Sequence, residues 1–180
     1  MEPLRIAVVG VESTGKTSLT QALAAHYACL AVKEIARDYI DNLNRKYTED
    51  DLLEIAHLQK DAELRCASEA RRRGDSLVIC DTTLLTIYIW GIVWFERSDA
   101  WIVQHMQQHA YAHHLLTDVH VPWTADPQRG FSKLSGRKAL HALYLEKLKQ
   151  YNWTYTQLRG DKNAYLQQAT SKIDALLRST

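Results

Sequence analysis

Short apolar runs alternate with longer segments of helical periodicity along the chain. The runs are rich in aliphatic, β-branched or aromatic residues, so they predict five strands, at 4–10, 29–34, 75–83, 112–119 and 153–160. Helical segments are predicted at 16–28, 34–44, 47–74, 83–96, 99–110, 138–152 and 163–177. Strands that alternate with helices are typical of an α/β fold with a parallel sheet. We therefore predict a three-layer α/β/α domain with five parallel strands.

Capping residues mark several of the predicted helix ends. Thr48 is expected to cap the long helix, with Asp51 at the capping-box position and Gly74 after its last turn. Asp99 and Asp161 are expected to cap two later helices. The segment at about 119–137 combines Pro, Gly, Ser and mixed charge with little periodicity. It is predicted to be a long functional loop, a candidate lid over a bound ligand.

Length and charge limit the classes of protein that the chain can belong to. Its 180 residues predict one domain over 1–180, and 22 basic against 21 acidic residues give a formal net charge of +1. This balance gives no reason to expect nucleic acid or an anionic membrane as a partner. The most apolar stretch, 84–95, is too short to span a bilayer. No basic leader is present at the N-terminus, so a cytoplasmic protein is expected; the oligomeric state is not predicted.

The segment "GVESTGKT" that follows the first predicted strand fits the phosphate-binding pattern GxxxxGK[ST]. Its backbone N–H groups and the next helix N-terminus can hold nucleotide phosphates. Lys16 supplies a cation to the β- and γ-phosphates, and the Thr17 hydroxyl can bind Mg²⁺. The alternative is a chance match, but a strand before and a helix after favour a P-loop NTPase fold. Candidate ATP-binding residues here are Gly10, Glu12, Ser13, Thr14, Gly15, Lys16, Thr17 and Ser18.

Carboxylates follow two other predicted strands. Asp81 ends the run "LVICD", which is typical of a residue that binds Mg²⁺ directly or through water, although it could simply cap the next helix. Glu34 ends the second strand, with Arg37 one turn on and Asp38 beside it. An acid there could bind ribose hydroxyls or accept a proton. It could equally be an ordinary charged helix start, and spacing alone does not decide.

The predicted lid carries Asp126, Arg129 and Arg137, and its arginines could neutralise charge on transferred phosphate; a solvated surface loop is the alternative. Trp123 in this loop is a candidate to stack on a ring. The tryptophans in apolar helices, Trp90, Trp94 and Trp101, are expected in the core. His113 and His114 are not expected to bind a metal ion, because no carboxylate or Cys stands at ligand spacing from them. GTPases are disfavoured because no DxxG or NKxD motif follows the later strands.

Five segments together resemble the ribosylnicotinamide kinase domain of NadR-type proteins: "GVESTGKTSL", "VKEIARDYI", "YTEDDLLEIAHLQ", "LVICDTTLLTIYIW" and "LLTDVHVPWTADPQRG". The resemblance implies ATP- and Mg²⁺-dependent phosphorylation of the ribose 5′-hydroxyl of nicotinamide riboside, a step in NAD biosynthesis. It departs from the family at Thr83, His120 and Pro127.

The resemblance also implies roles for the candidate residues, and the partner is then a small nucleoside-like molecule. The catalytic candidates are Lys16, Asp81, Glu34 and Arg129, and the metal candidates are Thr17 and Asp81. Arg129 and Arg137 are added to the ATP-binding candidates. The substrate-binding candidates are Glu34, Arg37, Asp38, Trp90, Trp123 and Asp126. Two alternatives stay open. The first is a kinase for another acceptor such as thiamine or a deoxynucleoside. The second is an ATP-binding regulatory module without transfer activity.

Overall fold

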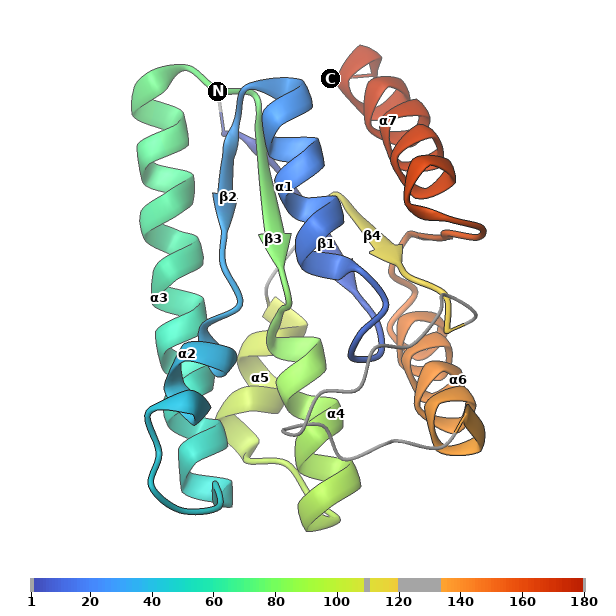
Figure 1. Ribbon diagram of the computed structural model, residues 1–180. Coiled ribbons are helices and arrows are strands. Elements are labelled where there is room, and N and C mark those ends of the chain that lie inside the picture. The colour runs from blue at the N-terminus through green and yellow to red at the C-terminus, as the bar shows by residue number, and fades with distance from the viewer. Residues whose placement is uncertain (1, 109–110, 120–133, 180) are drawn as a thin grey trace.

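The computed structural model describes residues 2–108, 111–119 and 134–179. These residues form one parallel sheet in the order β2-β3-β1-β4-β5 with helices on both faces (Figure 1). The strands are β1 Leu4–Val9, β2 Leu30–Val32, β3 Leu77–Asp81, β4 His113–Leu116 and β5 Tyr155–Gln157. The helices are α1 Lys16–Tyr27, α2 Ile35–Asp41, α3 Glu49–Arg73, α4 Leu84–Phe95, α5 Ala100–Gln108, α6 Leu134–Gln150 and α7 Lys162–Arg178. The predicted α/β fold with five parallel strands is confirmed.

Alternating residues of the central strand β1 divide the core into two layers. Ile6 and Val8 pack against α1 and α7, whereas Ala7 and Val9 face the layer that contains α4 and α6. This division follows from the period of two in a strand, which sends successive side chains to opposite faces. Because both faces are covered, the strands are apolar throughout rather than alternating with polar residues.

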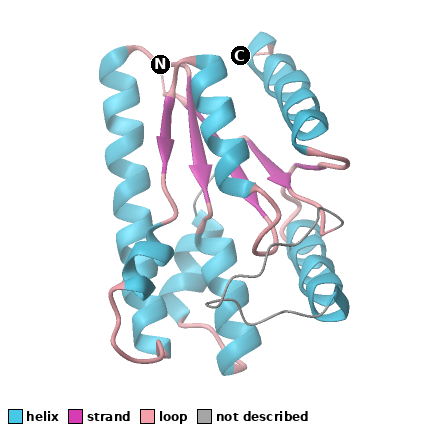
Figure 2. Ribbon diagram, viewed as in Figure 1, coloured by secondary structure: helices cyan, strands magenta, loops and turns pink. Residues whose placement is uncertain are grey.

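The carboxyl ends of the strands carry the loops of interest. In Figure 1 the arrowheads of β1 and β3 point toward the end of the sheet where α2 and α4 lie. Figure 2 shows the connecting loops of this end in pink. Parallel strands all present their carboxyl ends at one edge, which is where ligands bind in open α/β sheets.

The capping residues predicted for the long helix form a reciprocal pair. The Thr48 hydroxyl accepts a hydrogen bond from the Asp51 amide at 3.4 Å, and Asp51 Oδ2 accepts from the Thr48 amide at 2.6 Å. The Arg45 guanidinium also donates to both Asp51 oxygens, at 2.6 and 2.9 Å. Gly74 follows the last turn with φ 76°, in the left-handed region. Thr48, Asp51 and Gly74 thus fix α3 as predicted.

The later caps are confirmed as well. Asp161 accepts a hydrogen bond from the Ala164 amide at 2.9 Å at the start of α7. Asp99 accepts from the Trp101 amide at 2.7 Å at the start of α5. Side-chain oxygens at these positions bond to amides that have no partner inside the helix.

Two predictions about position were wrong. The predicted loop at 119–137 ends earlier, because α6 begins at Leu134 and Arg137 lies on this helix. Ser and Gly at 135–136 suggested a loop, but the first turn of a helix tolerates both. Trp94 was expected in the core and is 40% exposed. The last turn of α4 is less covered than its start, where Trp90 is buried, so an apolar sequence does not guarantee burial there.

Among the described helices, none combines the length and the apolar character needed to cross a bilayer.

Candidate functional site

The phosphate-binding pattern forms the loop between β1 and α1. Gly10 has φ 141° and Gly15, the residue before α1, has φ 87°, conformations that residues with a Cβ rarely adopt. Lys16 is the first residue of α1 and is buried; its ammonium group donates to the Val11 carbonyl at 3.0 Å. The Thr14 hydroxyl donates to the same carbonyl at 2.7 Å. The hydrogen bonds from Thr14 and Lys16 to Val11 hold the phosphate loop in a tight turn at the N-terminus of α1.

Thr117, directly after β4, anchors this loop from the neighbouring strand. Its amide and hydroxyl donate to the Val9 carbonyl at 3.0 and 3.2 Å, and the Thr14 and Thr117 hydroxyl oxygens lie 2.6 Å apart. A Cβ on Gly10 would collide with the Thr117 hydroxyl. Sequence reasoning missed Thr117, because only the β1–β4 pairing brings residues more than a hundred positions apart together.

Asp81, the last residue of β3, lies beside the start of the phosphate loop. The sheet register pairs it with Val8, two residues before Gly10. Its side chain is 1% exposed, and burial raises the pKa of the carboxyl, opposed by the Lys16 ammonium and the Thr17 hydroxyl. Neither carboxyl oxygen makes a hydrogen bond of ordinary geometry within the part of the chain described. The structure therefore brings Lys16, Thr17 and Asp81 together around a buried acid.

Further buried hydroxyls gather around the turn after β3. Thr82, Thr83 and Thr86 are at most 1% exposed, and no described residue forms a hydrogen bond with the hydroxyls of Thr82 and Thr83. Tyr144 of α6 is also fully buried, and burial raises the pKa of its hydroxyl. A contact with the Thr86 hydroxyl lowers this pKa, whereas the carboxylates of Glu12 and Glu34 raise it. Buried polar groups are rarely left without partners, except at sites that bind ligands, water or ions. Sequence reasoning did not identify Tyr144.

Glu34 and Arg37 face this turn from the start of α2. Arg37 Nε lies 3.9 Å from Glu34 Oε2, whose side chain is 15% exposed. The two act on Asp81 in opposite senses: the Glu34 carboxylate raises its pKa and the Arg37 guanidinium lowers it. Asp38 is exposed one residue further on. Glu34 and Arg37 thus lie within electrostatic range of Asp81, whereas Asp38 is not among the residues that shift the pKa of Asp81.

Arg137 reaches the phosphate loop from the other side. It is 3% exposed, and its guanidinium donates to the Glu12 carbonyl at 3.3 Å. Because α6 holds the residue, its position is set by helix packing rather than by a loop. The remaining lid candidates, Trp123, Asp126 and Arg129, lie outside the described residues and stay predictions.

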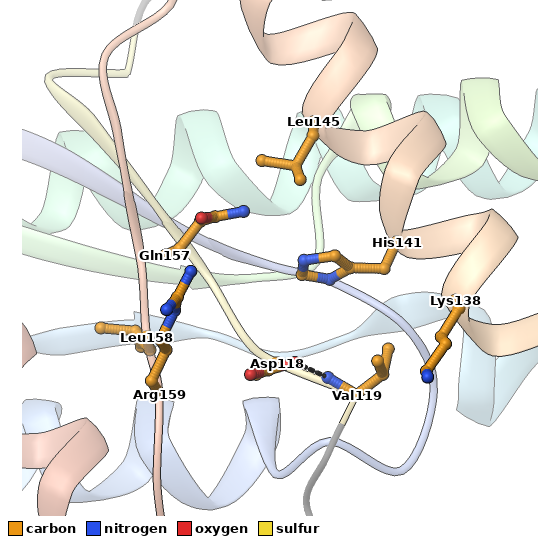
Figure 3. Close-up of a pocket in the computed structure, with 8 residues that line it drawn as sticks. All are labelled: Asp118, Val119, Lys138, His141, Leu145, Gln157, Leu158 and Arg159. Atoms are coloured by element: carbon orange, nitrogen blue, oxygen red, sulfur yellow. Dashed lines mark hydrogen bonds between the residues drawn. The ribbon is translucent and has the colours of Figure 1, made fainter. Parts of the chain in front are cut away.

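Among the described residues, two hollows adjoin the carboxyl ends of the strands. One, of about 480 Å³, lies at the ends of β4 and β5 against α6 (Figure 3). In Figure 3, Lys138 and His141 extend from α6 toward Asp118, and Arg159 and Gln157 face them from the β5 side. The other, of about 150 Å³, lies between Ser18 of α1 and Asn163 of α7 and includes Gly15 of the phosphate loop. Both are next to residues that the sequence assigned to ATP.

The comparison with known sequences gives a family match and similar curated relatives. The chain matches the family described as AAA domain over residues 5–164. The trifunctional NAD biosynthesis/regulator protein NadR of Salmonella typhimurium is 23% identical over 160 residues. The match covers 86% of this chain and 38% of the relative, so the chain spans well under half of that protein's length.

Solved structures show the same fold. A crystal structure of NadR protein in complex with NR has a TM-score of 0.75 at 19% identity, covering 89% of this chain and 46% of that one. A deoxyadenosine kinase from M. mycoides with products bound has a TM-score of 0.61 at 15% identity, covering 96% of this chain and all of its own. Because the family match extends over residues 5–164, the chain belongs to the AAA domain family.

Proposed function

We propose that the chain transfers the γ-phosphoryl group of ATP to the ribose 5′-hydroxyl of nicotinamide riboside, which gives nicotinamide mononucleotide for NAD synthesis. The observation that supports the proposal is the buried Asp81 carboxyl, whose pKa responds both to Lys16 of the phosphate loop and to Glu34. Phosphoryl transfer depends on holding donor and acceptor in line and neutralising charge, and this arrangement supplies a group on each side. The likeness to NadR, a protein of NAD biosynthesis, supports this choice of acceptor.

On the donor side, the backbone of Gly10 to Ser18 and the Lys16 ammonium would hold the ATP phosphates. Lys16 now donates to the Val11 carbonyl, a weak partner that phosphate oxygens would replace. Arg137 would add a second cation next to Glu12, and Arg129 a third. The hollow beside Gly15 and Ser18 offers room for the sugar or base of the nucleotide.

Mg²⁺ fits the pair formed by Thr17 and Asp81. Mg²⁺ prefers hard oxygen ligands and is usually held by one or two protein side chains together with phosphate oxygens and water. The oxygens of the buried Asp81 carboxyl and the nearby Thr17 hydroxyl match this donor set. When bound, the ion would neutralise charge on the β- and γ-phosphates.

On the acceptor side, we assign Asp81 to the attacking hydroxyl and Glu34 to the ribose. Asp81 is buried beside the phosphate loop, and a carboxylate at this position could accept the proton of the attacking hydroxyl. Glu34 and Arg37 face the same space, and Asp38, Trp123 and Asp126 complete the proposed set. Trp90 is 9% exposed and would act mainly by packing behind the residues that we assign to the acceptor.

The direct test is ATP turnover by the purified chain. We expect ADP and nicotinamide mononucleotide to form together, only when nicotinamide riboside and Mg²⁺ are both present. Lys16→Met should abolish both products while thermal denaturation shows the variant folded. Turnover with deoxyadenosine or thiamine but not with nicotinamide riboside would reassign the acceptor. ATP binding without turnover on any acceptor would favour the regulatory module.

A further inference from the structure

Gln59, near the middle of α3, connects two segments of the site. It is 1% exposed, and its Oε1 accepts a hydrogen bond from the Ile35 amide at 3.1 Å. Its Nε2 donates to the Thr82 carbonyl at 3.4 Å. Ile35 directly follows Glu34, and Thr82 directly follows Asp81. One side chain therefore bridges the two segments that carry the proposed acceptor-side carboxylates.

The bond from the Ile35 amide to Gln59 satisfies a donor at the start of α2. Ile35 is the first residue of α2, so its amide has no partner inside the helix. Glu34 precedes it in an extended conformation and makes no side-chain cap. Gln59 thus supplies this amide with an acceptor from another helix.

The amide orientation of Gln59 is fixed by its surroundings. The Ile35 N–H can only donate, and the Thr82 carbonyl can only accept. Glu63, one turn further along α3, also bonds to Gln59 and accepts from the Tyr111 hydroxyl at 2.7 Å. Only an amide presents an acceptor on one side and two N–H donors on the other. A glutamate of the same shape would direct a carboxylate oxygen at the Thr82 carbonyl and at Glu63.

We propose that Gln59 is a positioning residue that sets the separation of Glu34 and Asp81 by joining Ile35 to Thr82. This inference rests on the proposed phosphoryl transfer, because the separation matters only if the two acids act on one acceptor. Misplacement of reacting groups by about 1 Å can cost about a hundredfold in rate. The ATP phosphates are held by a different strand and loop, so ATP binding should not depend on Gln59.

Two substitutions of similar shape test this role. Gln59→Met removes both bonds, and Gln59→Glu keeps the acceptor but loses the donors. Gln104→Met, on the exposed face of α5, is the matched control. The first readout is hydrogen exchange of the Ile35 amide, measured by NMR. It should quicken by about tenfold or more in Gln59→Met, since a lost partner leaves the amide open to water, and stay unchanged in the control.

The second readout is the kinetic constants for each substrate. For Gln59→Met, kcat/KM for the acceptor should fall by about ten- to a hundredfold, while the Kd for ATP stays within about twofold of wild type. Gln59→Glu should lose at least as much at neutral pH. Relative to wild type at each pH, it should recover as the pH falls, because a protonated carboxyl regains a donor for Thr82.

Each contrary result has a distinct meaning. Unchanged exchange at Ile35 in a folded Gln59→Met chain would overturn the bridge itself. Faster exchange with normal acceptor kinetics, or equal losses for ATP and acceptor, would overturn the positioning role. If Gln59→Met does not fold, the pH recovery of Gln59→Glu decides. No acceptor-dependent turnover in the wild type would refute the proposed function, and Ile35 exchange would then still test the bridge.

Discussion

Gly10 and Thr117 approach so closely that a methyl group at Gly10 would overlap the Thr117 hydroxyl. Gly10 also has φ 141°, which a residue with a Cβ adopts only with strain. The phosphate loop is therefore fitted against the end of β4 as well as against its own helix.

Gly10→Ala should lower both stability and ATP affinity. We expect a loss of about 3 kcal/mol in the free energy of unfolding, because backbone strain and overpacking add. Urea denaturation measures this. Gly74→Ala is the control: its φ of 76° brings strain, but no atom lies within 4 Å of an added Cβ. It should cost about 1 kcal/mol and leave ATP affinity unchanged; equal costs would contradict the contact.

Asp81→Asn should separate stability from activity. Burial raises the pKa of the Asp81 carboxyl, so the folded state holds its proton more tightly than the unfolded state does. Stability from this group is present at low pH and is lost as the pH rises through the folded-state pKa. At neutral pH the amide should therefore raise the melting temperature, while turnover falls by orders of magnitude and ATP affinity stays nearly intact. Asp61→Asn, exposed on α3, should change neither. Near-normal turnover in Asp81→Asn would remove this residue from the mechanism.

Arg137→Met should slow phosphoryl transfer more than it weakens ATP binding. The guanidinium bonds to the Glu12 carbonyl and places charge at the phosphate loop, where it would act mainly on the transition state. We expect kcat to fall by about a hundredfold or more. Lys149→Met removes an exposed charge from the far end of the same helix and should leave kcat unchanged. Both kcat and ATP affinity should be measured for each variant. An equal loss of the two in Arg137→Met would contradict a role in the transition state.

Glu63 should make stability depend on pH. Burial raises the pKa of this carboxyl to about 7, against hydrogen bonds from Tyr111 and Gln59 that lower it. Because the folded-state pKa lies above the unfolded one, stability is full below the unfolded pKa and falls as the pH rises through about 7. The loss should reach about 3 kcal/mol. Denaturation at pH 5 and pH 8 should show a larger loss of stability in wild type than in Glu63→Gln, which keeps only the pH dependence of the other groups; equal losses would refute the prediction.

The fold could be predicted because the spacing of apolar and polar positions differs between strands and helices. The apolar runs of β1 and β3 and the capping pair Thr48 and Asp51 are local signals, and each produced the element expected. The phosphate loop could also be recognised from sequence, since glycine is required at fixed places in it. The position of Asp81 at the end of a buried strand could be predicted because it directly follows four apolar residues.

Contacts that depend on packing could not be predicted. Thr117, Tyr144 and Gln59 are ordinary residues in sequence, and only strand pairing and helix packing bring them to the site. Trp94 was misplaced for a similar reason, because burial depends on which neighbours cover a turn. Arg137 was assigned to a loop, since Ser and Gly are compatible both with a loop and with the first turn of a helix.

The strand order has a consequence for how such a site can change over time. β1 lies at the centre of the sheet, with β3 and β2 on one side and β4 and β5 on the other. The described residues that we assign to the acceptor, Glu34, Arg37, Asp38 and Asp81, follow β2 or end β3, whereas the loop is held by β4 and α6. Substitutions around α2 should therefore disturb the phosphate loop little. Substitutions in α2 and α4 alone could change which alcohol is accepted. This separation makes the scaffold easy to adapt to new acceptors.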